Sequence, residues 1–331
     1  MSPAARSATD PALDGALDLL AARPLVVLGG AGMSTDSGIP DYRGPGSPPR
    51  TPMTYQEFVA TSQARQRYWA RSHLGWGRMR HAEPNPGHRA LAALGPDLLI
   101  TQNVDGLHEA AGSRRLIALH GRIADVVCLG CREITSRATL HDRLEAANPG
   151  YAETHSAAEA RPDGDVALDD TANFVVPACG TCGGALKPDV VFFGENVPKD
   201  RVERCYAAVD ALAETHGALL VVGSSLTVMS GYRFVRRAAK AATPVVIVNR
   251  GATRGDDLAT HKLEVGVADF LGALVGARSI GLQALDEDVV GSLGLDLGAF
   301  TTGADQHAGL GRDDGDGLVR ERADAAHRAH Q

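Results

Sequence analysis

Six short apolar runs recur along the chain, and each is followed by a glycine-rich or polar turn. The runs are PLVVLGG, DLLITQN, LIALHG, DVVFFGE, ALLVVGSS and PVVIVNRG, with helical patterns between them at residues 12–22, 55–73, 87–94, 199–215 and 231–241. Strands that alternate with helices imply a parallel sheet covered by helices on both faces. The pattern therefore predicts an α/β, Rossmann-like fold, in which ligands bind beyond the carboxyl ends of the strands.

The stretch 127–184 breaks this rhythm, because it contains two CxxC pairs separated by polar and acidic residues. The pairs are Cys128 with Cys131 and Cys179 with Cys182. In a chain expected to be cytoplasmic, this spacing favours a closed tetrahedral Zn²⁺ site that leaves no open position for catalysis. We expect a small inserted zinc-binding module with a flexible loop, which divides the Rossmann-like domain into residues 19–126 and 185–274. The fifth cysteine, Cys205, lies in a helical pattern and is expected to be a buried structural thiol.

The two ends of the chain lie outside this predicted domain. Residues 1–18 form an N-terminal segment without an apolar signal core, and residues 275–331 are rich in Gly, Ala and Asp without a periodicity that could support a core. We expect a disordered tail and a cytoplasmic protein. The apolar runs are far shorter than the roughly 20 residues that cross a bilayer. The net charge of −7 and the lack of a long basic stretch argue against nucleic-acid partners. The oligomeric state stays open.

A glycine loop follows the first strand. Gly30 and Gly32 allow close backbone approach to a pyrophosphate, and the next helix start offers amide donors. Thr35 replaces the third glycine of the GxGxxG pattern, so a simple strand-to-helix turn is also consistent with this segment. The following SGIPDYRG segment places Asp41 and Arg43 on a loop, where ligand contact explains polar residues better than core packing does.

Polar residues also follow other strands. Gln102, Asn103 and Asp105 could hold a nicotinamide carboxamide, although Asn103 or Asp105 could equally cap a helix. His120 follows the run 116–119, where it would face the cleft as a general base; any one of the twelve histidines is more often a structural or surface group, so the position of His120 carries this interpretation. Ser224 and Ser225 could donate to phosphates and Asn249 could bind ribose, yet each of these segments alone is a common turn.

In combination the motifs are more specific. GAGMSTDSGIPDYRG, TQNVDGLHEAAG, LHG, the two CxxC pairs, KPDVVFFGE, GSSL and the asparagine of IVNRG occur in one order. The chain thereby resembles the sirtuin family of NAD-dependent protein deacylases over about residues 19–274. The segments DYRG, RQRYWAR and GSSLTVMSGYRF are most similar to its class II branch, which includes mitochondrial and bacterial members.

The resemblance implies attack of an acyl-lysine oxygen on the ribose of NAD, with release of nicotinamide and formation of O-acyl-ADP-ribose. It implies that His120 is the catalytic base, with Asn103 and Asp105 beside it and Gln102 on the nicotinamide side. The remaining implied NAD contacts are Gly30, Ala31, Gly32, Ser34, Thr35, Asp41, Tyr42, Arg43, Gly223, Ser224, Ser225, Asn249 and Val267. Protein substrates would bind by strand addition at Val190, Phe192, Phe193 and Gly194. The zinc would be structural, one ion per chain.

A pair of residues in RQRYWAR bears on the acyl group. Tyr68 and Arg71 are three residues apart, so a helix presents them on one face, where a phenol and a guanidinium could hold a carboxylate. In some family members a Tyr-x-x-Arg pair recognises acidic acyl chains, which suggests succinyl or glutaryl groups here. Alternatively, Tyr68 packs in the core and the arginines form a solvated face.

Two other functions stay open. A protein mono-ADP-ribosyltransferase, an activity also associated with the family, would use the same cofactor site. A non-catalytic module that binds NAD or zinc is disfavoured by His120 and Asn103, which a pure binder does not need.

Overall fold

The computed structural model describes residues 10–42, 51–155, 168 and 171–292. The chain divides into two units, residues 1–285 and residues 286–331, and the sheets with their helical layers belong to the first, apart from the last residues of the C-terminal helix, 286–292. Arg43, most of the expected flexible loop and the tail from residue 293 lie outside the described residues.

The first unit is built around a parallel sheet in the order β3-β2-β1-β7-β8-β9, and every neighbouring pair of strands is parallel. Its strands are β1 (Leu25–Gly29), β2 (Leu98–Thr101), β3 (Leu116–Ala118), β7 (Ala218–Val222), β8 (Val245–Val248) and β9 (His261–Leu263). The order reverses between β1 and β7, whose carboxyl ends are neighbours. In doubly wound sheets this switch point is where ligands bind.

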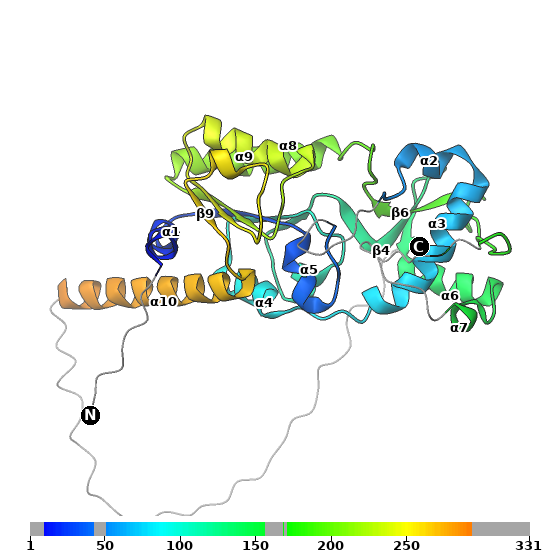
Figure 1. Cartoon of the computed structure of the whole chain (residues 1–331), viewed down its shortest axis with the longest axis horizontal. Helices are drawn as coiled ribbons and strands as arrows, with labels where there is room; N and C mark the ends of the chain where they lie inside the picture. The colour runs from blue at the N-terminus through cyan, green and yellow to red at the C-terminus, as the bar shows by residue number, and fades with distance from the viewer. Residues whose placement is uncertain (1–9, 43–50, 156–167, 169–170, 293–331) are drawn as a thin grey trace, which may run out of the picture. The chain divides into compact units, whose positions relative to one another are not determined.

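Helices cover both faces of this sheet (Figure 1). Val26 and Leu28 pack with α8 (Lys199–Glu214) and α9 (Met229–Lys240). Leu25 and Val27 pack on the opposite face. The helices on that face are α1 (Pro11–Ala21), α4 (Pro86–Leu94) and α10 (Val267–Ser292). Burial on two faces explains why the strand runs are continuously apolar, and it confirms the predicted Rossmann-like fold.

A second, antiparallel sheet has the order β5-β4-β6 and carries the CxxC pairs. It comprises β4 (Gly121–Cys128), β5 (Ile134–Ser136) and β6 (Leu186–Val190), accompanied by α6 (Arg137–Ala147) and α7 (Tyr151–Thr154). The run DVVFFGE was expected in the parallel sheet, which is wrong, because only Asp189 and Val190 of the run belong to a strand, and that strand, β6, pairs antiparallel with β4. An apolar run shows that a strand is buried, but it does not identify the partner strand.

The predicted helix 55–73 is two helices, α2 (Tyr55–Ala60) and α3 (Ser62–Met79). The extended backbone of Thr61 separates them, and a capping box between Thr54 and Glu57 starts α2. Trp69 of α3 is fully buried, and its indole donates to the Leu186 carbonyl at 3.0 Å. Helix α3 therefore packs on the module that holds the cysteines.

Both ends of the described chain are helical. Ala16 and Leu20 of α1 are fully buried against the sheet, although α1 lies mostly within the segment 1–18 that was set apart. Helix α10 continues past Leu274 to Ser292, where no regular structure was expected. Phe270, Leu271 and Leu274 anchor its first turns in the core, so the later turns extend a helix that has already begun. No helix among the described residues combines the length and apolar character needed to span a membrane.

The remaining helical elements are short turns around the carboxyl edge of the sheet. They are η1 (Ala31–Met33), η2 (Thr35–Ser37), α5 (Leu107–Ala110) and η4 (Asp256–Leu258).

Candidate active site

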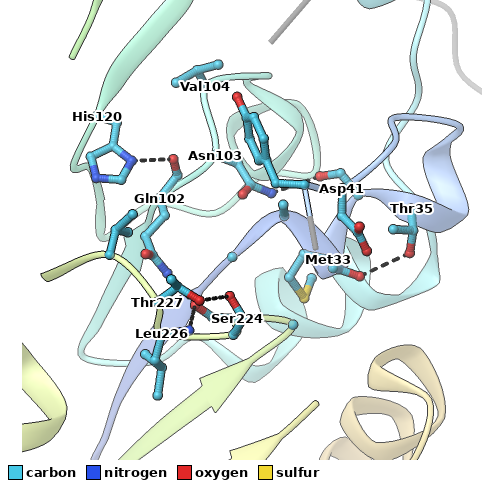
Figure 2. A pocket seen from close by; sticks show the side chains of 18 of the residues that line it. Met33, Thr35, Asp41, Gln102, Asn103, Val104, His120, Ser224, Leu226 and Thr227 are labelled. Atoms are coloured by element: carbon cyan, nitrogen blue, oxygen red, sulfur yellow. Dashed lines mark hydrogen bonds between the residues drawn. The ribbon is translucent and has the colours of Figure 1, made fainter. Parts of the chain in front are cut away.

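A cleft of about 980 Å³ opens at the carboxyl ends of β1, β2, β7 and β8 (Figure 2). The structure brings most of the predicted site residues together there. Its walls include Gly30, Ala31, Gly32, Ser34, Thr35, Asp41, Tyr42, Gln102, Asn103, Asp105, His120, Val190, Phe192, Phe193, Gly194, Gly223, Ser224, Ser225, Asn249 and Val267. Tyr68 and Arg71 are not among its lining residues.

The glycines after β1 are needed for contact between two loops. A Cβ at Gly30 would lie 2.6 Å from the Gly223 carbonyl oxygen, and one at Gly32 would lie 2.9 Å from the Gly223 Cα. The Gly32 amide donates to the Gly223 carbonyl at 2.8 Å. Besides any approach to a pyrophosphate, these glycines therefore let the loop after β1 pack directly on the loop after β7.

Ser34 organises one wall of the cleft. Its hydroxyl donates to Oδ2 of Asp105 at 2.6 Å and accepts from the amide nitrogen of Asn103 at 3.0 Å. Oδ1 of Asp105 accepts from the amide of Leu107, the first residue of α5, whereas the N-cap position of that helix is Gly106 and neither Asn103 nor Asp105. Burial raises the pKa of Asp105, while the hydrogen bonds from Ser34 and Leu107 oppose that shift. The polar groups of this wall are thus held in place by the protein itself.

Gln102 connects the ends of two strands. Its side-chain nitrogen donates to the Ser224 hydroxyl at 2.8 Å and faces the Gly29 carbonyl at 3.3 Å. A Cβ at Gly231 would lie 2.4 Å from Oε1 of the Gln102 side chain, so the first turn of α9 packs directly on this side-chain amide. The spacing of the motifs gave no sign of the Gly231 contact, because the two residues are far apart in the sequence.

His120 lies between β3 and β4, with its ring at the cleft (Figure 2). Nδ1 lies 2.8 Å from the backbone carbonyl oxygen of Gln102, and Nε2 lies 2.9 Å from the Ser230 hydroxyl. Burial lowers the pKa of His120, opposed by the hydrogen bond to Gln102 and reinforced by Arg201 and Arg233. The ring is therefore neutral at neutral pH.

The glycine of LHG has a steric role. Gly121 has φ +80°, and a Cβ there would lie 1.9 Å from the Asp189 carbonyl oxygen. A side chain at this position would push β4 from β6 and displace the neighbouring His120.

The segment that follows β6 is already fixed by internal contacts. The Tyr55 amide donates to the Phe193 carbonyl at 2.9 Å, and the Phe192 amide donates to Glu195 at 2.9 Å. Glu195 also pairs with the buried Lys187, at 2.9 Å. The ring of Tyr68 packs against that of Phe192, with centroids 5.1 Å apart. Tyr68 thus lies behind a residue of the cleft wall.

The four cysteines of the two pairs form one cluster. Their sulfur atoms lie within 4.8 Å of one another, with Cys128 and Cys182 3.5 Å apart and Cys131 and Cys179 3.8 Å apart. Zn–S bonds of about 2.3 Å in a tetrahedron give S···S edges of about 3.8 Å. A Cβ at Gly184 would lie 2.9 Å from the Cys128 sulfur, so glycine makes room for the cluster. The arrangement fits a closed Zn²⁺ site. Cys205 is separate and buried, as predicted, and burial raises its pKa to about 12.

Comparison with known proteins gives consistent matches. Residues 30–230 match the model of the Sir2 family. The chain is 54% identical over 268 residues to NAD-dependent protein deacetylase 1 of Mycobacterium avium, covering 79% of this chain and 94% of that protein. It is 55% identical over 274 residues to NAD-dependent protein deacetylase 1 of Streptomyces coelicolor, with coverages of 78% and 90%.

Solved structures show the same similarity. A structure described as "Sir2-p53 peptide-NAD+" superposes with a TM-score of 0.62 at 30% identity, covering 81% of this chain and 99% of that chain. One described as "Sir2 bound to acetylated peptide" gives a TM-score of 0.63 at 28% identity, with the same coverages.

Proposed function

The chain belongs to the Sir2 family and is an NAD-dependent protein deacylase, and we propose that the cleft at the carboxyl edge of its parallel sheet is the active site. The relatives that it matches over most of their length are named deacetylases. The observation that carries the proposal for the site is the convergence of the loops after β1, β2, β3, β7 and β8 on one cleft.

The residues of the cleft are suited to hold NAD. The backbone loops at Gly30–Gly32 and Gly223–Ser225 would bind the phosphates, and Asn249 and Val267 would lie on the adenosine side. Asn103 and Asp105, held by Ser34, would bind the nicotinamide side. When bound, NAD supplies the ribose carbon that loses nicotinamide and accepts the acyl oxygen.

His120 would act as the general base. The backbone carbonyl of Gln102 can only accept a hydrogen bond, so Nδ1 carries the ring proton and Nε2 carries the lone pair, toward which the Ser230 hydroxyl points. The lowered pKa keeps that lone pair available at neutral pH. We assign His120 the removal of a proton from a ribose hydroxyl.

Ser230 would position and support this base. A hydroxyl can donate to a neutral ring nitrogen and accept from a protonated one, and the bond to the charged ring is the stronger of the two. Ser230 therefore favours proton uptake by Nε2. Sequence reasoning missed this residue. It lies in the first turn of α9, 110 positions after His120, and no sequence motif connects the two.

Acyl-lysine side chains of proteins are the substrates. The segment from Val190 to Gly194 would bind the peptide backbone, supported by Lys187 and Glu195 underneath it. A structure bound to an acetylated peptide and one bound to a propionylated peptide are among those similar to this chain.

We keep an acidic acyl group as a proposal about preference. It rests on Tyr68 and Arg71 and on the contact between Tyr68 and Phe192, which lines the cleft. The zinc at the four cysteines would be structural, because four thiolates leave no coordination position for a reactant.

The test is incubation of the purified protein with NAD and a panel of acyl-lysine peptides. One nicotinamide and one O-acyl-ADP-ribose per deacylated lysine are expected. Transfer of ADP-ribose to protein without peptide deacylation would instead indicate a mono-ADP-ribosyltransferase. NAD binding without any product would indicate a binding module.

A further inference from the structure

A second cluster of metal-ligating side chains shares no residue with the cleft wall or with the cysteine cluster. His141 and Glu145 are four residues apart on α6, so they lie on one helical face. His73 of α3 faces them, and one potential ligand atom from each of the three residues lies within 4.8 Å of the others. The His73 and His141 rings are 4.6 Å apart between centroids.

His73 lacks the hydrogen bonds that a buried histidine normally makes. It is only 1% exposed, and neither Nδ1 nor Nε2 has a hydrogen-bond partner. Nε2 lies 3.1 Å from a carboxylate oxygen of Glu145, but without hydrogen-bond geometry. Nδ1 of His141 is also buried without a partner. Buried polar atoms almost always have a hydrogen-bond partner. The buried ring nitrogens between α3 and α6 are therefore candidates to coordinate a ligand.

The protonation states suit metal binding. Burial lowers the pKa of His73 to about 4 and that of His141 to about 4. Both rings are therefore neutral at neutral pH, which is the form that coordinates metals. The side chain of Glu145 is 43% exposed, so an ion can reach the cluster from solvent.

Nearby charges limit the affinity. Arg137 is buried one turn before His141, with its guanidinium 5.2 Å and 5.1 Å from the ring centroids of Trp69 and Trp76. The positive charge of Arg137 lowers the pKa of both histidines, and that of Arg80 lowers the pKa of His141. Glu153 raises the pKa of His73, and Glu145 raises that of His141. The two cations repel a metal ion, so binding should be weaker than at four thiolates.

We propose that His73, His141 and Glu145 form a second site for a divalent transition-metal ion, which clips α3 to α6. Two imidazoles and one carboxylate suit Zn²⁺, Co²⁺ or Ni²⁺, with water in the open positions. Ligand atoms around such an ion lie about 3.4 Å apart for bonds of about 2.1 Å, so small side-chain rotations close the cluster. Met79, on the last turn of α3, lines the cleft, so the clip would hold one of its walls.

Cobalt is the probe for this site. The full-length protein is dialysed against a mild chelator, and retention of one zinc per chain is verified by elemental analysis. It is then equilibrated with CoCl₂, and bound cobalt, the visible spectrum and the melting temperature are recorded. Glu145→Gln and His141→Gln remove ligands at a partly exposed position, so folding should survive. His81→Gln removes an exposed histidine and is the matched control.

The wild type and His81→Gln should each bind one cobalt beside the retained zinc and melt at a higher temperature. Glu145→Gln and His141→Gln should bind cobalt at least tenfold more weakly, with unchanged zinc content. The proposal is overturned if the wild type takes up no cobalt or if both ligand variants bind it normally. It is equally overturned if the spectrum shows intense sulfur-to-cobalt charge transfer, which would place the ion at the cysteines.

Discussion

Nε2 of His120 lies 2.9 Å from the hydroxyl oxygen of Ser230, while Nδ1 of the same ring lies 2.8 Å from the Gln102 carbonyl oxygen. The carbonyl determines which nitrogen carries the proton, and the hydroxyl faces the nitrogen that would accept one in the proposed mechanism. The two contacts orient the ring from opposite ends, so the proposed base is held in one orientation by the protein itself.

Replacement of Ser230 by alanine should lower kcat about tenfold and change the KM for NAD little. The removed hydrogen bond is stronger to the protonated ring, and a loss of about 1.4 kcal/mol corresponds to a tenfold lower rate.

The pH profile gives a second readout of the same contact. Burial already lowers the pKa of His120 below 6.5, so kcat/KM of the wild type should stay flat from neutral pH to below pH 6.5. The acid limb of Ser230→Ala should move lower still.

Ser230→Thr keeps the hydroxyl and should restore both kcat and the pH profile. A Ser230→Ala enzyme with normal kcat and an unmoved acid limb would show that the contact does not serve the base.

The zinc site predicts a loss of structure when one ligand is removed. Cys179→Ala should purify with much less than one zinc per chain and unfold at a lower temperature, because metal binding energy is folding energy in small sites. Cys205→Ala is the matched control, since Cys205 lies on α8 in the core of the parallel sheet and does not belong to the cysteine cluster. Full zinc content and an unchanged melting temperature in Cys179→Ala would contradict the assignment.

The fold was largely predictable, because it depends on local patterns. The parallel sheet confirms the interpretation of the continuous apolar runs, and the cluster of four cysteines confirms that of the paired CxxC spacing. Pairing of β6 with β4 was not predictable, since a strand's partner is chosen by long-range packing. The separation of α2 from α3 depends on the backbone of a single residue, Thr61.

The position of a candidate residue at the cleft was predictable where the residue lies at or just after the end of a strand, as Gln102 and His120 do. Residues that act through contacts between distant segments were missed. Ser230 touches His120, and Gly231 packs on Gln102, but neither pairing leaves a spacing signal in the sequence. The role predicted for Gly30, close approach to a pyrophosphate, was incomplete for the same reason. A Cβ at Gly30 would also collide with the distant residue Gly223.

The acyl preference depends on Arg71. If Tyr68 and Arg71 bind a carboxylate, the wild type should act on succinyl- or glutaryl-lysine peptides more efficiently than on acetyl-lysine peptides. Arg71→Met should lower kcat/KM for the acidic peptides at least tenfold and leave that for acetyl-lysine nearly unchanged. A wild-type preference for acetyl groups, or equal losses on both peptides, would reject the idea.

His108 makes stability depend on pH. It is 1% exposed, neither ring nitrogen has a partner, and burial, followed by the influence of His88, lowers its pKa to about 3. The unfolded chain takes up this proton from about pH 6.5 downward, so the stability contribution is present above that pH and is lost as pH falls toward 3.

The free energy of unfolding should therefore fall about 1 kcal/mol more between pH 6 and pH 5 in the wild type than in His108→Leu. Denaturant titrations at the two pH values measure this difference. The exposed control His81→Gln should behave as the wild type does. An identical pH slope in His108→Leu would mean that His108 is not buried in its neutral form.

The most direct test of the central claim is a comparison of wild type and His120→Ala with NAD and an acyl-lysine peptide that the wild type deacylates. Nicotinamide release, O-acyl-ADP-ribose formation and NAD affinity are measured on folded, zinc-loaded protein. The account predicts that His120→Ala binds NAD with an affinity close to that of the wild type and forms no O-acyl-ADP-ribose. Near-normal formation of that product by His120→Ala would contradict it.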